Sequence, residues 1–131
     1  MNYVIIGNSV AAVGAVEGIR KQDKTTPIII ISDEPYHAYS RPLISYYLGR
    51  QVTQESIYYR TEDFYRVNRV ELILGIKAQQ VDFDRKEVIL QDGRRINYTK
   101  LLIATGGKPL IPPLEGIDKQ NVFNFSKFDD V

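Results

Sequence analysis

The residues best suited to chemistry in this chain form a short turn near its start, Gly7-Asn8-Ser9-Val10-Ala11-Ala12. An apolar run precedes the turn, and a run of small residues typical of a closely packed helix follows it. A helix that begins there directs backbone N–H groups and the positive end of its dipole at the space above the sheet. A pyrophosphate suits that space. We therefore predict a dinucleotide-binding unit in which Gly7, Ser9, Ala11 and Ala12 contribute to the site.

The glycine pattern of this turn departs from the usual dinucleotide fingerprint. Gly7 supplies the first glycine, Ser9 replaces the second, and Ala12 stands at the third position, where alanine still permits close packing of helix on strand. The Ser9 side chain either crowds the phosphates or caps the helix and donates to a phosphate oxygen. The alternative for the whole segment is an ordinary βαβ unit in which the glycine only turns the chain.

Two carboxylates follow the second apolar run, Ile28–Ile31. Asp33 and Glu34 lie about twenty residues beyond the turn, the distance at which a carboxylate reaches a ribose hydroxyl in dinucleotide-binding folds. An acidic strand end recognises ribose without specifying what lies beyond the phosphates, so NAD or AMP stays open as a ligand.

Composition excludes several classes of function. Seventeen basic and sixteen acidic residues give a net charge of +1, which offers no broad field for nucleic acid or an anionic membrane. The chain has no cysteine, so we expect no disulfide, no thiolate catalysis and no cysteine-ligated metal. No apolar stretch is long enough to span a membrane, and the start lacks the features of a signal peptide, so we expect a cytoplasmic protein without a metal site.

The elements that would position these residues are short strands and helices. Continuous apolar runs predict parallel strands, buried on both faces, at Tyr3–Ile6, Ile28–Ile31 and 100–105, with Ile28–Ile31 in the centre. A helix is expected over about Val10–Gln22 and a further strand over 71–74.

Alternating residues over 78–83, 87–91 and 95–98, joined by tight turns, predict an antiparallel three-stranded meander. Short helices are expected at 43–48 and 62–69, and the proline-rich segment 108–113 is expected to be extended. Seven of the nine tyrosines fall between Tyr36 and Tyr65. They either stack on an aromatic ligand or, as is more frequent, pack the short helices.

In order and spacing, the segments VIIGNSVAAVGA, IIISDEPYHAYSRPLISYYL and INYTKLLIATGGKPLIPPLEG resemble the N-terminal part of the FAD-dependent pyridine nucleotide-disulfide oxidoreductase family. They are most similar to its branch of NADH:rubredoxin reductases, ferredoxin reductases and the flavin portion of nitrite reductases. The resemblance implies an α/β fold, a Rossmann-like FAD-binding βαβ sheet with an antiparallel meander, truncated before the NAD-binding domain. Residues 1–115 would be the N-terminal part of the FAD-binding domain, and 116–131 the start of a linker to a missing NAD-binding domain.

The resemblance also implies roles for individual residues. The turn would hold the FAD pyrophosphate, and Asp33 or Glu34 the adenosine ribose. The remaining positions implied to line the cofactor are Arg41, Pro42, Lys77, Ala78, Ala104, Thr105 and Gly106. Lys77 and Ala78 would meet the adenine through backbone atoms. Ser9 departs from the family pattern, as does Tyr46, where related ferredoxin reductases often carry lysine.

Within this resemblance, the absence of cysteine separates subclasses. Disulfide reductases of the superfamily carry a redox-active cysteine after the second strand, and 36–47 contains none. The resemblance therefore implies electron flow from NADH or NADPH through FAD to a one-electron acceptor: rubredoxin, ferredoxin or the metal centre of a nitrite reductase. The partner would be a redox carrier protein or a fused redox domain. The alternative is a non-catalytic adenine-dinucleotide-binding module or subunit.

No catalytic residue is identified. Arg41 is the only basic side chain between Lys24 and Arg50, so it is the candidate ion for a phosphate or flavin oxygen, the alternative being a solvated loop arginine. His37, the sole histidine, has no identifiable partner, and we expect a surface or capping role. We expect this chain alone not to complete a catalytic cycle, and its exposed apolar surface to favour a homodimer.

Overall fold

The computed structural model describes residues 1–131 and divides them into two compact units. Unit 1 comprises Met1–Tyr39 and Tyr58–Thr105, and unit 2 comprises Ser40–Ile57 and Gly106–Val131. All seven strands and the helices α1 and α4 belong to unit 1. The residues of the predicted turn and the two predicted carboxylates therefore lie in the same unit.

Unit 1 is built on a four-stranded parallel sheet with the order β3-β2-β1-β7. These strands are β1 (Tyr3–Ile6), β2 (Ile28–Ile31), β3 (Val70–Ile73) and β7 (Lys100–Ile103). Ile6 pairs in register with Ile31 and with Ile103, and Ile31 pairs with Ile73. All four strands therefore end level with one another, and the segments that leave them emerge along one carboxyl edge.

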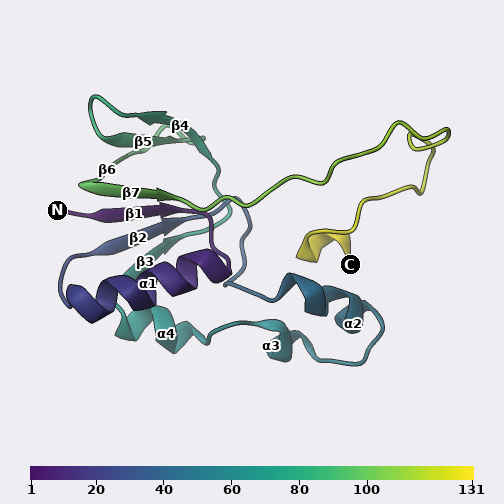
Figure 1. The fold of residues 1–131 in the computed structure, drawn as a ribbon, viewed down its shortest axis with the longest axis horizontal. Helices are drawn as coiled ribbons and strands as arrows, with labels where there is room; N and C mark the ends of the chain where they lie inside the picture. The colour runs from purple at the N-terminus through teal and green to yellow at the C-terminus, as the bar shows by residue number, and fades with distance from the viewer. The chain divides into compact units, whose positions relative to one another are not determined.

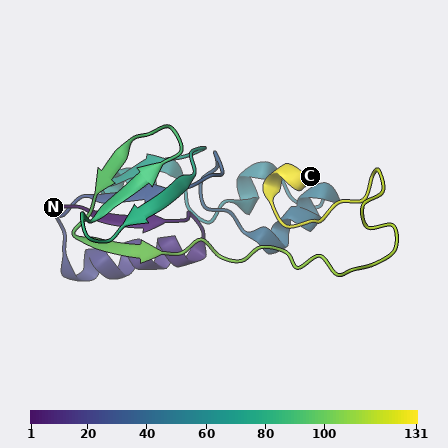
Figure 2. The ribbon, with the colours of Figure 1, turned by 90° about the horizontal axis from the view of Figure 1, so that it is seen from above.

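Both faces of this sheet are covered (Figures 1 and 2). The helices α1 (Val10–Gln22) and α4 (Glu62–Val67) lie on one face, and the antiparallel meander β4 (Ala78–Asp82), β5 (Glu87–Leu90) and β6 (Arg95–Asn97) lies on the other. The isoleucines of β2 alternate accordingly. Ile28 and Ile30 pack in the cluster that contains Ala12, whereas Ile29 and Ile31 pack in the cluster that contains Val88.

A buried arginine fixes α4 against α1. Arg20 is 8% exposed, and its Nε donates to the Asn68 carbonyl at 2.7 Å while its Nη1 donates to the Asp23 carbonyl at 3.0 Å. Asp23 and Asn68 are the C-cap residues of α1 and α4, so one guanidinium satisfies carbonyls at the ends of both helices.

Most predicted elements are confirmed, with small differences at their ends. β1, β2 and α1 have the expected bounds, and the strand expected over 71–74 begins one residue earlier. α4 ends at Val67 and not at 69, because Asn68 caps it and Arg69 adopts a left-handed backbone with a φ of 51°. β7 ends at Ile103, two residues earlier than expected.

Unit 2 contains the short helices η1 (Arg41–Leu43), α2 (Ile44–Leu48), α3 (Gln54–Ile57) and η2 (Phe128–Asp130). The helix expected over 43–48 is confirmed as α2, which η1 precedes. The rings of Tyr47 and Phe128 stack with centroids 5.5 Å apart, and Arg41 Nη1 donates to the Ser126 carbonyl at 2.7 Å. These contacts join the two chain segments of unit 2. No helix in the structure has the length and apolar character needed to cross a membrane.

Candidate functional site

The turn after β1 lies at the carboxyl edge and is tightly constrained. The Gly7 N–H donates to the Ile31 carbonyl at 2.8 Å, and the Ala104 N–H donates to the Ile6 carbonyl at 2.7 Å. Gly7 has a φ of +108°, and a Cβ built on it would overlap the carbonyl oxygen of Ala104 and lie 2.7 Å from its carbonyl carbon. Glycine is required here by the end of the neighbouring strand as well as by the turn itself.

The first amides of α1 face the end of this turn without a partner inside the helix. The first helical bond runs from the Val13 N–H to the Ser9 carbonyl at 3.1 Å, so the N–H groups of Val10, Ala11 and Ala12 have no helical acceptor. Ser9 is the N-cap residue, with extended backbone, but its hydroxyl makes no capping hydrogen bond. The capping role considered for the Ser9 side chain is therefore wrong. The Ala12 side chain is fully buried against the sheet and serves packing.

The two carboxylates after β2 differ in their surroundings. Glu34 is 9% exposed, and its Oε2 accepts a hydrogen bond from the Tyr39 hydroxyl at 2.6 Å. Its backbone N–H donates to Ser32 Oγ at 3.2 Å. Asp33 is exposed. The Glu34 carboxylate is thus held in one orientation by a buried hydrogen bond.

The segment that follows β3 is hydrogen-bonded to this carboxylate segment. The Ile76 N–H donates to the Ser32 carbonyl at 3.0 Å, and the Gly75 N–H donates to the Glu34 carbonyl at 3.3 Å. Lys77 and Ala78, at the start of the meander, follow directly. The Lys77 carbonyl accepts from the Gln91 N–H at 2.9 Å, so this backbone group already has one partner.

Ten of the thirteen residues predicted for the site belong to unit 1. They are Gly7, Ser9, Ala11, Ala12, Asp33, Glu34, Lys77, Ala78, Ala104 and Thr105. All lie in or next to segments that leave the carboxyl ends of the four parallel strands. Arg41, Pro42 and Gly106 belong to unit 2, where Arg41 and Pro42 are exposed.

The order of the strands makes this edge the candidate ligand site. The chain passes from β1 through α1 to β2 on one side, whereas β7 pairs with β1 on the other side. In open α/β sheets, ligands bind outside the carboxyl ends of the strands where the strand order reverses in this way. The turn after β1, with Gly7 and Ser9, lies at that reversal.

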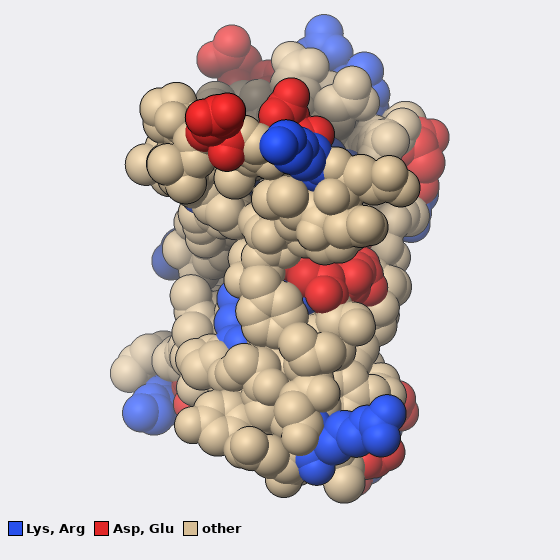
Figure 3. All heavy atoms as spheres, turned by 90° about the vertical axis from the view of Figure 1, so that its right-hand side faces the viewer, with Lys and Arg blue, Asp and Glu red and all other residues tan.

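The charged side chains on the face drawn in Figure 3 form no large patch of one sign. On the face drawn in Figure 3, basic and acidic side chains lie singly or in small groups among uncharged ones. This distribution agrees with the net charge of +1.

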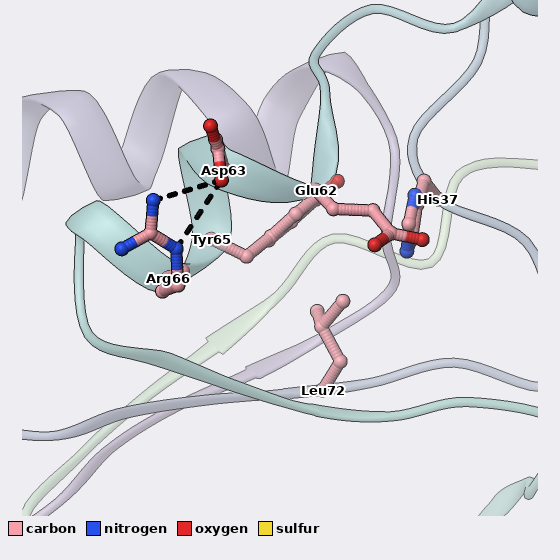
Figure 4. Close-up of a pocket in the computed structure, with 6 residues that line it drawn as sticks. All are labelled: His37, Glu62, Asp63, Tyr65, Arg66 and Leu72. Atoms are coloured by element: carbon pink, nitrogen blue, oxygen red, sulfur yellow. Dashed lines mark hydrogen bonds and ion pairs between the residues drawn. The ribbon is translucent and has the colours of Figure 1, made fainter.

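A separate cavity of about 460 Å³ lies beside α4, lined by His37, Glu62, Asp63, Tyr65, Arg66 and Leu72 (Figure 4). No residue predicted for the cofactor site lines it. The His37 ring packs against Tyr65, with centroids 5.4 Å apart, and against Tyr58 at 6.1 Å. His37 is thus half-buried, with its ring packed against two tyrosines, and it lies apart from the residues predicted for the cofactor.

Two residues near the site were not predicted. Asn8 lies within the turn, and Tyr65 lies on α4, yet the Tyr65 hydroxyl donates to Asn8 Oδ1 at 3.3 Å. The only sequence feature that pointed to Asn8 was its amide side chain within the turn motif. No sequence pattern connects it to a tyrosine 57 positions away.

Comparisons with known proteins agree with this fold. The family described as pyridine nucleotide-disulphide oxidoreductase matches residues 1–131. Putidaredoxin reductase from Pseudomonas putida is 36% identical over 129 residues, which cover 95% of this chain and 30% of that protein. A subunit of NADH-dependent phenylglyoxylate dehydrogenase from Aromatoleum evansii is 34% identical over 128 residues, covering 98% of this chain and 30% of the relative.

Solved structures give the same result. A ferredoxin reductase from Rhodopseudomonas palustris superposes with a TM-score of 0.87 at 25% identity, covering 98% of this chain and 32% of that one. NADH:rubredoxin oxidoreductase from Clostridium acetobutylicum gives a TM-score of 0.82 at 26% identity, covering 98% and 33%. The chain thus spans about a third of the length of these proteins. The parallel sheet, the meander and the match along the whole sequence confirm the predicted fold, and this chain belongs to the pyridine nucleotide-disulphide oxidoreductase family.

Proposed function

We propose that this chain is the FAD-binding portion of an NAD(P)H-dependent oxidoreductase that passes electrons through the flavin to a one-electron acceptor. The observation that carries the proposal is the arrangement at the carboxyl edge of the parallel sheet. There the turn at Gly7 leads from β1 into the first amides of α1, and Glu34 follows the adjacent strand β2.

The groups at this edge fit the ADP half of FAD. A pyrophosphate needs amide donors, which Val10, Ala11 and Ala12 offer at the start of a helix of 13 residues. A ribose diol needs an acceptor, and the Glu34 carboxylate, which accepts a hydrogen bond from Tyr39, is the acceptor that this edge would offer.

The other predicted contacts complete the proposed site. The Ser9 hydroxyl, which makes no cap bond, would donate to a phosphate oxygen. Asp33 would share the ribose with Glu34, the backbone of Lys77 and Ala78 would meet the adenine, and Ala104 with Thr105 would form a wall along the cofactor. Gly106 would continue that wall, and Arg41 and Pro42 would lie at the pyrophosphate and flavin side of the cofactor. FAD supplies a carrier that accepts a hydride from a nicotinamide and releases electrons one at a time.

The domain organisation and the electron acceptor are parts of the same proposal. Residues 1–115 would belong to the FAD-binding domain, and 116–131 would lead towards an NAD-binding domain. Because the chain spans about a third of its relatives or less, we propose the electron transfer for a whole protein and not for these 131 residues alone. We place that protein in the cytoplasm.

Relatives support the class of acceptor. Two of them are named for reductions of putidaredoxin and rubredoxin, and another is the large subunit of an NADH-dependent nitrite reductase from Escherichia coli, 31% identical over 133 residues. The chain contains no cysteine, which favours a route from the flavin to a redox carrier protein or a fused redox domain over one through a disulfide.

A competition experiment tests the binding proposal. FAD binding to the chain is followed by fluorescence, and ADP or FMN is added as competitor. ADP shares the pyrophosphate and adenosine that the edge is proposed to bind, whereas FMN shares only the flavin side. We expect ADP to displace FAD and FMN not to displace it. A chain that binds FMN but not ADP, while circular dichroism shows it folded, would contradict the proposed site.

A second experiment separates an electron-transfer protein from a non-catalytic dinucleotide-binding module. A polypeptide that contains this chain and spans the full length of its relatives is loaded with FAD, and NADH is added with a one-electron acceptor such as ferricyanide. Oxidation of NADH that depends on FAD supports the oxidoreductase. Stable FAD binding without any NADH oxidation supports the binding module.

A further inference from the structure

Three hydrogen bonds link the turn after β1 to the loop after β2 through α4. The Ala38 N–H donates to the Tyr65 hydroxyl oxygen at 3.1 Å, and the Tyr65 hydroxyl donates to Asn8 Oδ1 at 3.3 Å. Asn8 Nδ2 then donates to the Tyr36 carbonyl at 3.2 Å. The series therefore starts and ends in one loop, with the turn and the helix between.

The direction of each bond follows from the groups involved. The Tyr36 carbonyl only accepts, so the amide nitrogen of Asn8 faces it and the amide oxygen faces Tyr65. The Tyr65 oxygen accepts from Ala38, which leaves its one hydrogen for Asn8. No other arrangement of these donors and acceptors satisfies all three contacts.

Tyr65 is held firmly where it makes these bonds. Its side chain is 3% exposed and packs in the same cluster as Ala12 and Ile30. The ring meets Phe64 edge to face at 5.3 Å and His37 at 5.4 Å, and Figure 4 shows it on α4 above β3. Burial raises the pKa of the Tyr65 hydroxyl, so the group is a neutral donor at physiological pH.

The linked segments are the two halves of the proposed nucleotide site. Asn8 stands between Gly7 and Ser9, whose turn would hold the pyrophosphate. The loop at 36–38 follows Asp33 and Glu34, which would hold the ribose. Ala104 borders the turn on the β7 side, through its contact with Gly7, and the bond from the Tyr65 hydroxyl to Asn8 Oδ1 ties the turn to α4.

We infer that Tyr65 is a positioning residue for dinucleotide binding: through Asn8, its hydroxyl sets the turn at 7–9 relative to the loop at 36–38. This inference rests on the proposed function, because it holds that the hydrogen-bonded linkage fixes the distance between the groups that would bind the phosphates and those that would bind the ribose. Tyr65 itself touches no cofactor in this proposal. Its effect on affinity is transmitted by Asn8.

Tyr65→Phe removes the hydroxyl and retains the packed ring, and Tyr3→Phe is its matched control. The Tyr3 hydroxyl also makes one side-chain hydrogen bond, to Asp23 Oδ2 at 3.0 Å, but Tyr3 begins β1 and the turn follows the other end of that strand. Asn8→Ala removes the bond with Tyr65 from the other side, together with the bond from Asn8 Nδ2 to the Tyr36 carbonyl.

Isothermal titration of the chain with ADP measures the effect. We expect Tyr65→Phe and Asn8→Ala each to weaken ADP binding about three- to tenfold, the value of the one net hydrogen bond that both variants lose, from Tyr65 to Asn8. The double variant should lose less than the product of the two single fold-changes, because the Tyr65–Asn8 bond is lost in both. Tyr3→Phe should leave the Kd unchanged. Unchanged affinity in Tyr65→Phe, or an equal loss in Tyr3→Phe, would overturn the inference.

Amide hydrogen exchange without ligand separates this inference from the proposed function. In Tyr65→Phe the hydrogen-bonded amides at the two ends of the turn, those of Gly7 and Val13, should exchange faster than in wild type, relative to those of the meander, and in Tyr3→Phe they should not. If the wild-type chain binds no ADP, the proposed function fails and this measurement still decides whether Tyr65 positions the turn. Unchanged exchange at Gly7 and Val13 would overturn the positioning role even where ADP binds normally.

Discussion

Replacing Gly7 by alanine should destabilise the fold before any ligand is present. The added Cβ would overlap the Ala104 carbonyl, and both atoms belong to backbone segments that cannot rotate away. The φ of +108° is a conformation that residues with a Cβ rarely adopt.

The expected loss in the free energy of unfolding is the sum of two costs, the strained backbone of residue 7 and the overlap with Ala104. Holding a residue with a Cβ in a sparsely populated backbone region costs about 1–3 kcal/mol. Forcing the ends of β1 and β7 apart is an overpacking change that costs about 1–3 kcal/mol more. Together they amount to about 2–6 kcal/mol, a large part of the 5–15 kcal/mol that stabilises a typical domain.

Urea unfolding followed by circular dichroism measures this loss, with Gly14→Ala as the control. Gly14 lies within α1, and a Cβ there meets nothing within 4 Å, so alanine should stabilise the chain by about 0.5–1 kcal/mol through helix propensity. A Gly7→Ala variant whose free energy of unfolding lies within about 0.5 kcal/mol of wild type would refute the reasoning.

Three further predictions concern the carboxylates and the sheet edge. Replacing Asp33 and Glu34 together by alanine should weaken ADP binding by about 1.5–3 kcal/mol, the range for hydrogen bonds to charged groups, and calorimetry that finds equal affinity would remove both from the site. Hydrogen bonds from Thr26, Thr25 and Tyr3 lower the pKa of Asp23. Because the folded pKa lies below the unfolded value of about 3.9, this stabilisation is present above pH 4 and is lost as the pH falls further, so Asp23→Asn should flatten the acid limb of a stability profile. Ile103 is 57% exposed on the edge strand β7, so Ile103→Lys should reduce any self-association seen by sedimentation, and an unchanged dimer would place the contact elsewhere.

Much of unit 1 could be predicted from the sequence because its signals are local and agree with one another. The four isoleucines of β2 form a run that only a strand buried on both faces accommodates, and the small residues of α1 follow directly from the turn. Because β1 and β2 are parallel neighbours, the turn after β1 and the carboxylates after β2 lie at the same edge of the sheet. The agreement of β1, α1 and β2 with their expected bounds reflects this consistency.

The remaining features of the fold and of the site could not be predicted from the sequence, because most of them depend on contacts between residues that are distant in the chain. The four-residue helix α3 lacks the length for a periodic pattern, and the end of α4 depends on the left-handed backbone of Arg69. The bond between Asn8 and Tyr65, like the contact of Gly7 with Ala104, joins positions that become neighbours only after the sheet has formed. Ser9 has the residue type of a helix cap, but its hydroxyl makes no such bond.

The alternation of isoleucines along β2 has a consequence for how this protein can vary. With two residues of the strand committed to the helical layer and two to the meander, no side chain of β2 is left for recognition. Substitutions inside the strand should therefore change whether the protein folds, whereas its preference among nucleotides should be adjusted in the connections beyond the strand ends. Scaffold and selectivity are thereby separated into different stretches of the polypeptide, and each can change without the other.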